Sequence, residues 1–242
     1  MHREYHCWWS PNLNRTMELL VFGHAGAKVL VFPTRGGRFF EYEQIGLVNS
    51  LAEKINSGQL QLYCVDSVDA ESIYCFWAHP HGRINRHQQY EEYILQEVLP
   101  LMAHKNDHSC TIAHGCSLGA FHAANIFFRH PHLFSKLAAF SGRYDLTWQV
   151  DCFGNQFDGF YNEDIYYNTP SHFLQNLECP ERLHQIDSSD IVFTIGNQDP
   201  FLQNNHLMSQ ILNQKGVPHR MYEWEGRAHR GYYWRKMAPL YL

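Results

Sequence analysis

The chain has 242 residues, of which 45% are hydrophobic, 15% aromatic and 18% charged, and its formal net charge is −5. A chain of this length and composition can bury a substantial core, and we interpret it as one large α/β domain rather than two small ones. It has no basic stripe, which argues against nucleic acid and anionic membranes as partners. A homo-oligomer stays compatible with this composition.

The beginning of the chain, MHREYHCWWS, has no basic segment followed by an apolar run of the length that a secretory signal needs. No stretch of about 18 apolar residues occurs, so we expect no membrane-spanning helix. The seven cysteines are scattered without close pairs, which is typical of reduced thiols. The sequence therefore predicts a soluble cytoplasmic protein.

Apolar runs bounded by turn residues predict strands at residues 5–9, 16–22, 28–32, 60–65, 110–113, 137–140, 191–195 and 219–224. The first three look like an antiparallel entry into the sheet. Apolar residues at helical spacing predict helices at residues 41–56, 85–103, 120–129, 201–214 and 231–242. Pro100 is expected to kink or thin the last turn of the second helix. This alternation favours a mostly parallel sheet with helices on both faces.

Residues 66–69, Asp-Ser-Val-Asp, directly follow the predicted strand at 60–65, where open α/β sheets place functional loops. We favour a helix cap here, because Ser67 or Asp69 before Ala70 suits a helix N-terminus. The alternative is a contact between Asp66 and a substrate.

The pentapeptide Gly-x-Ser-x-Gly at residues 115–119 stands between an apolar strand and an Ala-rich helix. Strand, sharp turn and helix in this order are typical of a nucleophile elbow, in which Gly115 and Gly119 let the strand and the helix approach closely. Such a motif also arises by chance, but its position between these two elements favours the functional interpretation. We therefore expect Ser117 to stand exposed at the carboxyl end of a strand.

A serine hydroxyl is a poor nucleophile at neutral pH, so it needs a base within hydrogen-bond reach and a third group to orient that base. In the α/β-hydrolase arrangement the chain order is Ser, then Asp or Glu, then His, each after a strand. Asp199 and His229 follow the predicted strands at 191–195 and 219–224, so they are the candidates for these two roles. Their rivals lie before a strand or within a helix: Asp187, Asp190, His206 and His219.

Acyl transfer also needs N–H donors that face the oxyanion of the tetrahedral intermediate. One is expected from the backbone of Leu118, directly after the nucleophile. The second is expected from the Gly-rich loop after the strand at 28–32. We favour the backbone N–H of Arg35, with Thr34 and Gly36 as close alternatives.

Residues 143–189 are rich in aromatic, Asn and Asp residues with weak periodicity, which suggests an irregular cap or insert over the site. Tyr144 in this segment and Trp224 near the histidine loop are candidates for substrate contact. Ordinary core packing explains both residues equally well. Elsewhere, His79, His81 and His87 could suggest a metal site, but no ligand set at zinc spacing accompanies them, so we expect no metal.

Five stretches resemble a family of cytoplasmic esterases within the α/β-hydrolase group, which includes esterase D-like, feruloyl-esterase-like and mycolyltransferase-like proteins. They are VFPTRGGRFFEYEQ, QLYCVDSVDAES, GCSLGAFHAANIFFRHPHLF, FSGRYDL and GRAHRGYYWRKMAPLYL. The resemblance covers nearly the whole chain. It implies a serine carboxylic-ester hydrolase without a cofactor, with Ser117 as nucleophile, Asp199 as orienting acid and His229 as base, acting on a small-molecule ester of short acyl or sugar-linked type.

Two alternatives stay open. Transfer of the acyl group to an alcohol or sugar shares the same acyl-enzyme. A hydrolase-like binding protein without turnover is suggested by Arg230, because relatives usually carry an aspartate directly after the catalytic histidine. If Arg230 pointed toward the imidazole of His229, it would disfavour the imidazolium that forms during catalysis.

Overall fold

A computed structural model describes all 242 residues and contains one eight-stranded sheet with the strand order β1-β2-β4-β3-β5-β6-β7-β8. The strands are β1 (Arg3–Ser10), β2 (Arg15–Phe22), β3 (Ala27–Phe32), β4 (Leu60–Val65), β5 (Thr111–Cys116), β6 (Lys136–Phe140), β7 (Asp190–Gly196) and β8 (Arg220–Trp224). The helices are α1 (Glu41–Gln44), α2 (Leu47–Ser50), α3 (Ala52–Asn56), α4 (Pro80–Tyr93), α5 (Leu99–Lys105), α6 (Leu118–Arg129), α7 (Glu163–Tyr167), α8 (Pro170–Phe173), α9 (Pro180–Asp187), α10 (Leu202–Gln214) and α11 (Gly231–Tyr241).

The predicted fold class, a mostly parallel α/β-hydrolase sheet, is confirmed. Strands β1 and β2 pair antiparallel with each other, and β2 pairs antiparallel with β4, while all other pairs are parallel. The prediction that the third strand belongs to an antiparallel entry was wrong. Strand β3 lies in the middle of the sheet, parallel to β4 and β5. The helical segment after β3 returns the chain to the end of the sheet at which β3 begins, so β4 runs in the same direction.

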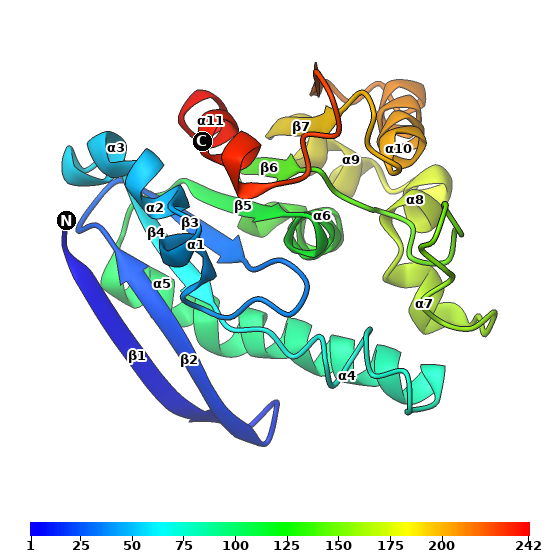
Figure 1. Cartoon of the computed structure of the whole chain (residues 1–242), viewed down its shortest axis with the longest axis horizontal. Coiled ribbons are helices and arrows are strands. Elements are labelled where there is room, and N and C mark those ends of the chain that lie inside the picture. The colour runs from blue at the N-terminus through cyan, green and yellow to red at the C-terminus, as the bar shows by residue number, and fades with distance from the viewer.

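Helices cover both faces of the sheet (Figure 1). Successive residues of a strand point to opposite faces. Leu30 of β3 accordingly belongs to the core on the face covered by α4, α5, α6 and α10, whereas Val31 belongs to the core on the face covered by α1, α2, α3 and α11. Helix α6 is buried along nearly its whole length, which explains its Ala-rich and Phe-rich sequence. No helix of the protein is both long and apolar enough to cross a bilayer.

The predicted helix at residues 41–56 is three short helices in the structure. Gly46 adopts a left-handed conformation with φ of +76°, which ends α1 and redirects the chain into α2. A side-chain-bearing residue rarely adopts this conformation, so the glycine marks the break. The apolar spacing alone did not reveal it, because both short helices pack on the same face of the sheet.

The predicted helix at residues 85–103 begins earlier, at Pro80, whose missing N–H suits the first turn of a helix. His79 caps this end by accepting the N–H of His81 at 3.2 Å. Near the other end, Pro100 lacks the N–H that a regular α-helix would use, and a π-helical turn at Ile94–Val98 precedes it. Helix α4 is thus followed without a break by the π-helical turn and by α5.

Residues 143–189 connect β6 to β7 and contain α7, α8 and α9. Helix α8 packs on α6 and α10, and α7 packs on α4. A small apolar cluster forms beside the elbow, where Leu146 and Phe157 meet Leu118 and Phe121 of α6. The segment is therefore more ordered than its weak periodicity suggested.

Candidate active site

Ser117 lies at the turn between β5 and α6 with φ of +57° and ψ of −119°, a conformation that is rare for a residue with a side chain. Its N–H donates to the carbonyl of Phe140 on β6 at 2.8 Å. A Cβ atom on Gly115 would lie 2.2 Å from the backbone of Gly119, and one on Gly119 would lie 2.3 Å from the carbonyl oxygen of Phe32. Both glycines are thus required by the close approach of strand and helix.

The structure brings Ser117, His229 and Asp199 together from three different loops. The Oγ of Ser117 lies 2.9 Å from Nε2 of His229, and Nδ1 of His229 lies 2.6 Å from Oδ2 of Asp199. With the proton on Nδ1, the imidazole accepts from the hydroxyl and donates to the carboxylate. Asp199 is only 4% exposed, and its Oδ1 accepts the N–H of Phe201 at 2.9 Å, so both carboxylate oxygens are held.

The rival acids and bases have partners elsewhere. Asp190, at the opposite end of β7, pairs with Lys136 at 3.3 Å and also with Arg220. Asp187 is exposed at the end of α9. His206 on α10 faces Glu223, and Nε2 of His219 lies 2.7 Å from the Oγ of Ser209.

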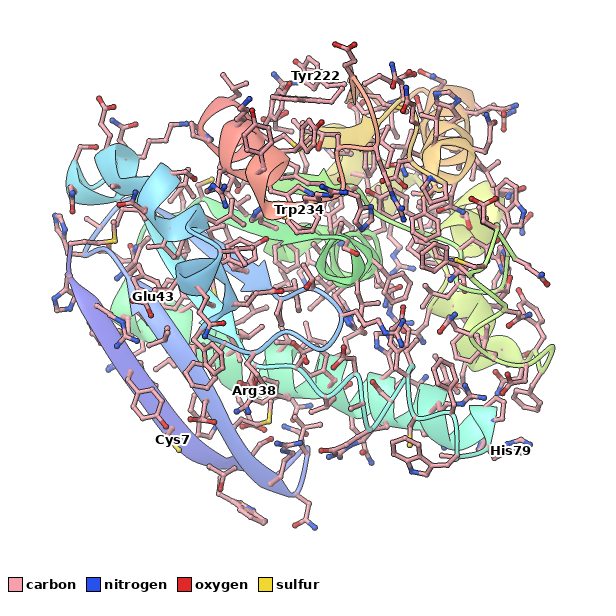
Figure 2. All side chains as sticks on the ribbon, viewed as in Figure 1. Cys7, Arg38, Glu43, His79, Tyr222 and Trp234 are labelled. Carbon is pink, nitrogen blue, oxygen red and sulfur yellow. The ribbon has the colours of Figure 1, made fainter.

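Two residues that sequence reasoning missed hold the histidine loop. Ser141, at the end of β6, donates its hydroxyl to the carbonyl of Ala228 at 3.1 Å and accepts the indole N–H of Trp234 at 3.1 Å. Trp234, near the start of α11 (Figure 2), also lies with its ring centroid 5.7 Å from that of His229. The position of Ser141 directly after a predicted strand was the only available signal.

The predicted oxyanion donors differ in what surrounds their N–H groups. Leu118 is the first residue of α6, so its N–H has no carbonyl one turn earlier within the helix.

On the loop after β3, the N–H of Thr34 donates to Oε2 of Glu41 at 2.7 Å, and the N–H of Gly36 donates to Oδ2 of Asp69 at 2.5 Å. The N–H of Arg35, between them, donates to no protein acceptor. The geometry therefore favours Arg35 over Thr34 and Gly36.

The Asp-Ser-Val-Asp loop after β4 begins no helix, so the predicted helix cap was wrong. Its side chains support the neighbouring Gly-rich loop instead. Asp66 accepts from Nε of Arg38 at 2.6 Å, and the hydroxyl of Ser67 donates to the carbonyl of Gly37 at 3.0 Å. Burial raises the pKa of Asp66, although the neighbouring Arg38 opposes this shift. Figure 2 shows Arg38 on the loop between β3 and α1, beside β2.

A pocket of about 150 Å³ opens beside Ser117 and His229. Its apolar and aromatic walls are Tyr74, Leu118, Leu146, Phe153 and Phe201, and three arginines complete its lining, Arg35, Arg143 and Arg227. A larger depression of about 480 Å³ on α10 has only polar walls and includes none of these residues.

The three predicted substrate contacts do not line this pocket. Asp66 is buried against Arg38, as described above. Tyr144 is fully buried with its ring edge-on to Phe193, and the indole N–H of Trp224 faces the hydroxyl of Tyr241 at 3.3 Å. Core packing accounts for both aromatic residues, which leaves neither as a wall of the pocket.

Arg230, which raised the doubt about turnover, is exposed at the residue before α11. Its side chain makes no hydrogen bond or ion pair, and it does not line the pocket. The imidazole of His229 is therefore flanked by the rings of Phe201 and Trp234 rather than by this guanidinium.

The model of the family described as "Putative esterase" matches residues 42–236, which include Ser117, Asp199 and His229 but not the loop that carries Arg35. The chain belongs to this family. It is a carboxylic ester hydrolase of the α/β-hydrolase type. No protein of curated function matches the esterase significantly.

Solved structures with the same fold include a ferulic acid esterase, at 16% identity and a TM-score of 0.75, with 99% of this chain and 95% of that chain covered. An S-formylglutathione hydrolase from Agrobacterium tumefaciens has 14% identity and a TM-score of 0.72, with 98% and 91% covered. One from Staphylococcus aureus has 14% identity and a TM-score of 0.70, with 99% and 98% covered. At these identities the likeness concerns the fold.

Proposed function

We propose that this esterase hydrolyses small esters through a Ser117–His229–Asp199 triad and an acyl-enzyme intermediate. The observation that carries this proposal is the continuous chain of hydrogen bonds from Oγ of Ser117 through the imidazole to the buried carboxylate, at 2.9 Å and 2.6 Å. Each of these contacts has the length at which proton transfer and orientation are efficient.

In the first half of the reaction, Oγ of Ser117 attacks the ester carbonyl while Nε2 of His229 takes the hydroxyl proton. The tetrahedral intermediate then collapses, the C–O bond to the alcohol breaks, and His229 gives the proton to the departing alcohol. In the second half, water attacks the acyl-enzyme with His229 again as base, and the carboxylic acid leaves. Asp199 keeps the imidazole oriented and stabilises its charged form.

The backbone N–H groups of Leu118 and Arg35 are the proposed oxyanion donors. Removing one donor of this kind from a hydrolase costs about 2.7–4 kcal/mol of transition-state stabilisation. The carboxylates of Glu41 and Asp69 support this assignment, because they bind the N–H groups on either side of Arg35 and fix the loop before substrate arrives.

The size of the pocket supports a short acyl group. A cavity of about 150 Å³ in a protein core is known to hold a molecule the size of benzene, and the pocket beside Ser117 has about this volume. We therefore expect the octanoate ester to be hydrolysed more slowly than the butyrate ester.

Hydrolysis of p-nitrophenyl acetate, butyrate and octanoate by the wild type and by Ser117→Ala tests the proposal. We expect the substitution to lower kcat by a factor of 10⁴ or more, roughly the loss that accompanies removal of a triad member. Ser188→Ala, at an exposed serine after α9, is the control and should retain full activity. Equal rates for wild type and Ser117→Ala would refute the triad, and new ester products in the presence of an added alcohol would indicate acyl transfer.

A further inference from the structure

Three arginines share the pocket with Ser117, and none of them pairs with a carboxylate. Arg35, Arg143 and Arg227 all line the pocket, whereas the ion pairs of this protein involve other arginines. The chain as a whole is acidic, with a formal net charge of −5. The cluster is therefore a local concentration of positive charge at the reacting centre rather than a consequence of a basic composition.

Arg143 is the most informative of the three, because it is only 6% exposed. Its Nε donates to the carbonyl of Asp145 at 3.1 Å, and its Nη2 donates to the carbonyls of Trp148 and Gly154 at 2.7 Å and 2.8 Å. These bonds hold the guanidinium rigidly, over the ring of Phe201 with 5.5 Å between Cζ and the ring centroid. Its Nη1 has no protein acceptor.

No carboxylate compensates this buried charge directly. The carboxylate of Asp145, whose carbonyl binds Arg143, directs Oδ1 to the backbone N–H groups of Thr147 and Trp148 and Oδ2 to His172 at 3.0 Å. Burial lowers the pKa of Arg143, although Tyr74 and Asp145 oppose that shift. Burying a cation that lacks an ionic partner is costly. An anionic group of a substrate in this pocket would supply that partner, and the free Nη1 of Arg143 could donate to it.

Arg35 and Arg227 also line the pocket, and the guanidinium groups of both lack a carboxylate partner. The guanidinium of Arg35 lies over the ring of Tyr74, with 4.2 Å between Cζ and the ring centroid, and makes no side-chain hydrogen bond. Arg227, on the loop that carries His229, is exposed and also has no side-chain partner. The carboxylates of Asp69 and Asp199 have other partners, since Asp69 accepts the N–H of Gly36 and Asp199 binds His229.

We propose that the preferred substrate is an anionic ester, whose carboxylate or phosphate group binds Arg143 together with Arg227 or Arg35 while its ester carbonyl faces Ser117. This inference rests on the proposed function, because it places the anion in the same pocket as the nucleophile. Guanidinium groups are suited to this task, since they donate to oxyanions in a fixed planar geometry and stay charged at any working pH.

Two pairs of substrates separate charge from size. The first pair is 4-acetoxybenzoate and its methyl ester, with the anion on the alcohol part. The second is mono-4-nitrophenyl adipate and its methyl ester, with the anion on the acyl part. In at least one pair we expect kcat/KM to be about 10-fold or more higher for the anionic member, as for charge-assisted hydrogen bonds. Including 4-acetoxyphenyl phosphate shows whether the site prefers phosphate to carboxylate.

The ratio of the two kcat/KM values on the same variant is the quantity to compare, because partial loss of folded enzyme cancels in it. Arg143→Gln and the exposed Arg227→Gln should each lower this ratio toward one. Arg230→Gln removes an arginine outside the pocket and should leave the ratio of the wild type. Raising the ionic strength from about 0.01 M to about 1 M, which shortens the Debye length from about 30 Å to about 3 Å, should lower the ratio in the wild type.

Wild-type ratios of one or less in both pairs would overturn the inference, as would a preference that both arginine substitutions leave intact. These outcomes are distinct from a failure of the proposed function. If the triad is wrong, Ser117→Ala retains hydrolysis of neutral and anionic esters alike. If only the substrate class is wrong, all activity still depends on Ser117 but shows no preference for charge.

Discussion

Of the three N–H groups that are candidate oxyanion donors on the loop after β3, only that of Arg35 has no protein acceptor. Asp69 binds the N–H of Gly36, and Glu41 binds that of Thr34, so the loop after β3 is fixed from two sides. Which of these N–H groups stays free is therefore decided in part by Asp69, whose carboxylate binds the N–H of Gly36 from 33 residues further along the chain. This dependence explains why the sequence left Arg35, Thr34 and Gly36 as alternatives.

If the N–H of Arg35 binds the oxyanion as proposed, Asp69 is a positioning residue, and Asp69→Ala should lower kcat by about 10-fold with a smaller change in KM. The reason is that a loosened loop weakens a donor that matters mainly in the transition state. Steady-state kinetics with p-nitrophenyl acetate measure this split. Glu71→Ala is the control, since this exposed carboxylate pairs with Arg86 instead. A rise in KM at constant kcat would contradict the assigned role.

Arg230 is the residue that raised the doubt about turnover, and its side chain makes no hydrogen bond with His229, whose two ring nitrogens face Ser117 and Asp199. Arg230→Asp should therefore change kcat/KM by less than about fivefold, because exposed charges interact by less than about 1 kcal/mol. The pH–rate profile with a neutral ester is the measurement. A large gain in rate, or a clear shift of the acidic limb, where protonation of the imidazole abolishes activity, would mean that this arginine does disfavour the imidazolium.

At the scale of elements, the joint between β5 and α6 places the nucleophile. Gly119→Ala would put a methyl group 2.3 Å from the carbonyl oxygen of Phe32, a backbone atom that cannot move without the strand. We expect a loss of about 1–3 kcal/mol or more in the free energy of unfolding, as for overpacked cores. Urea unfolding measures it. Gly82→Ala, in an exposed and open part of α4, should instead stabilise by about 0.5–1 kcal/mol. Equal effects of the two changes would contradict the packing argument.

Elements were predictable where one pattern decides them. Strand β4 was predicted with its exact bounds, because a buried apolar run is bounded there by turn residues. The elbow was predictable because Gly115 and Gly119 stand where a strand and a helix approach too closely for side chains. The break at Gly46 was not predictable, since an isolated glycine is also tolerated within a helix. The roles of Ser141 and Trp234 were missed because they arise from contacts between segments far apart in the chain.

In the whole molecule, strands β5 to β8 run parallel, so the loops after β5, β7 and β8 lie at the same, carboxyl end of the sheet. This arrangement brings Ser117, Asp199 and His229 together. Chain order was sufficient to predict this arrangement, because each residue follows a recognisable strand. The pocket was not predictable, since its lining comes from six separate segments, one after each strand from β3 to β8. The cytoplasmic location, the single-domain organisation and the assembly of copies stay predictions.

Buried histidines predict a loss of stability in acid. Burial lowers the pKa of His87 and of His114 from 6.5 to about 4. Between these values the unfolded chain binds protons that the folded chain does not, so stability is full above pH 6.5 and falls as the pH drops toward 4. Each residue contributes roughly 3 kcal/mol to this loss.

Tm measured from pH 7 to pH 4 tests this expectation. His114→Gln should flatten the dependence, while His104→Gln, at an exposed histidine, should not. A Tm that stays constant between pH 6.5 and 4.5 would contradict the account.

Covalent labelling tests the central claim most directly. A fluorophosphonate reacts with a serine only when a base activates it and an oxyanion site receives the phosphoryl oxygen, so one reagent probes the whole assembly. Mass spectrometry of the digested esterase should find one adduct per chain, on Ser117, with labelling at least 100-fold slower in folded His229→Ala. Absence of an adduct, an adduct on another residue, or equal labelling rates in wild type and His229→Ala would contradict the account.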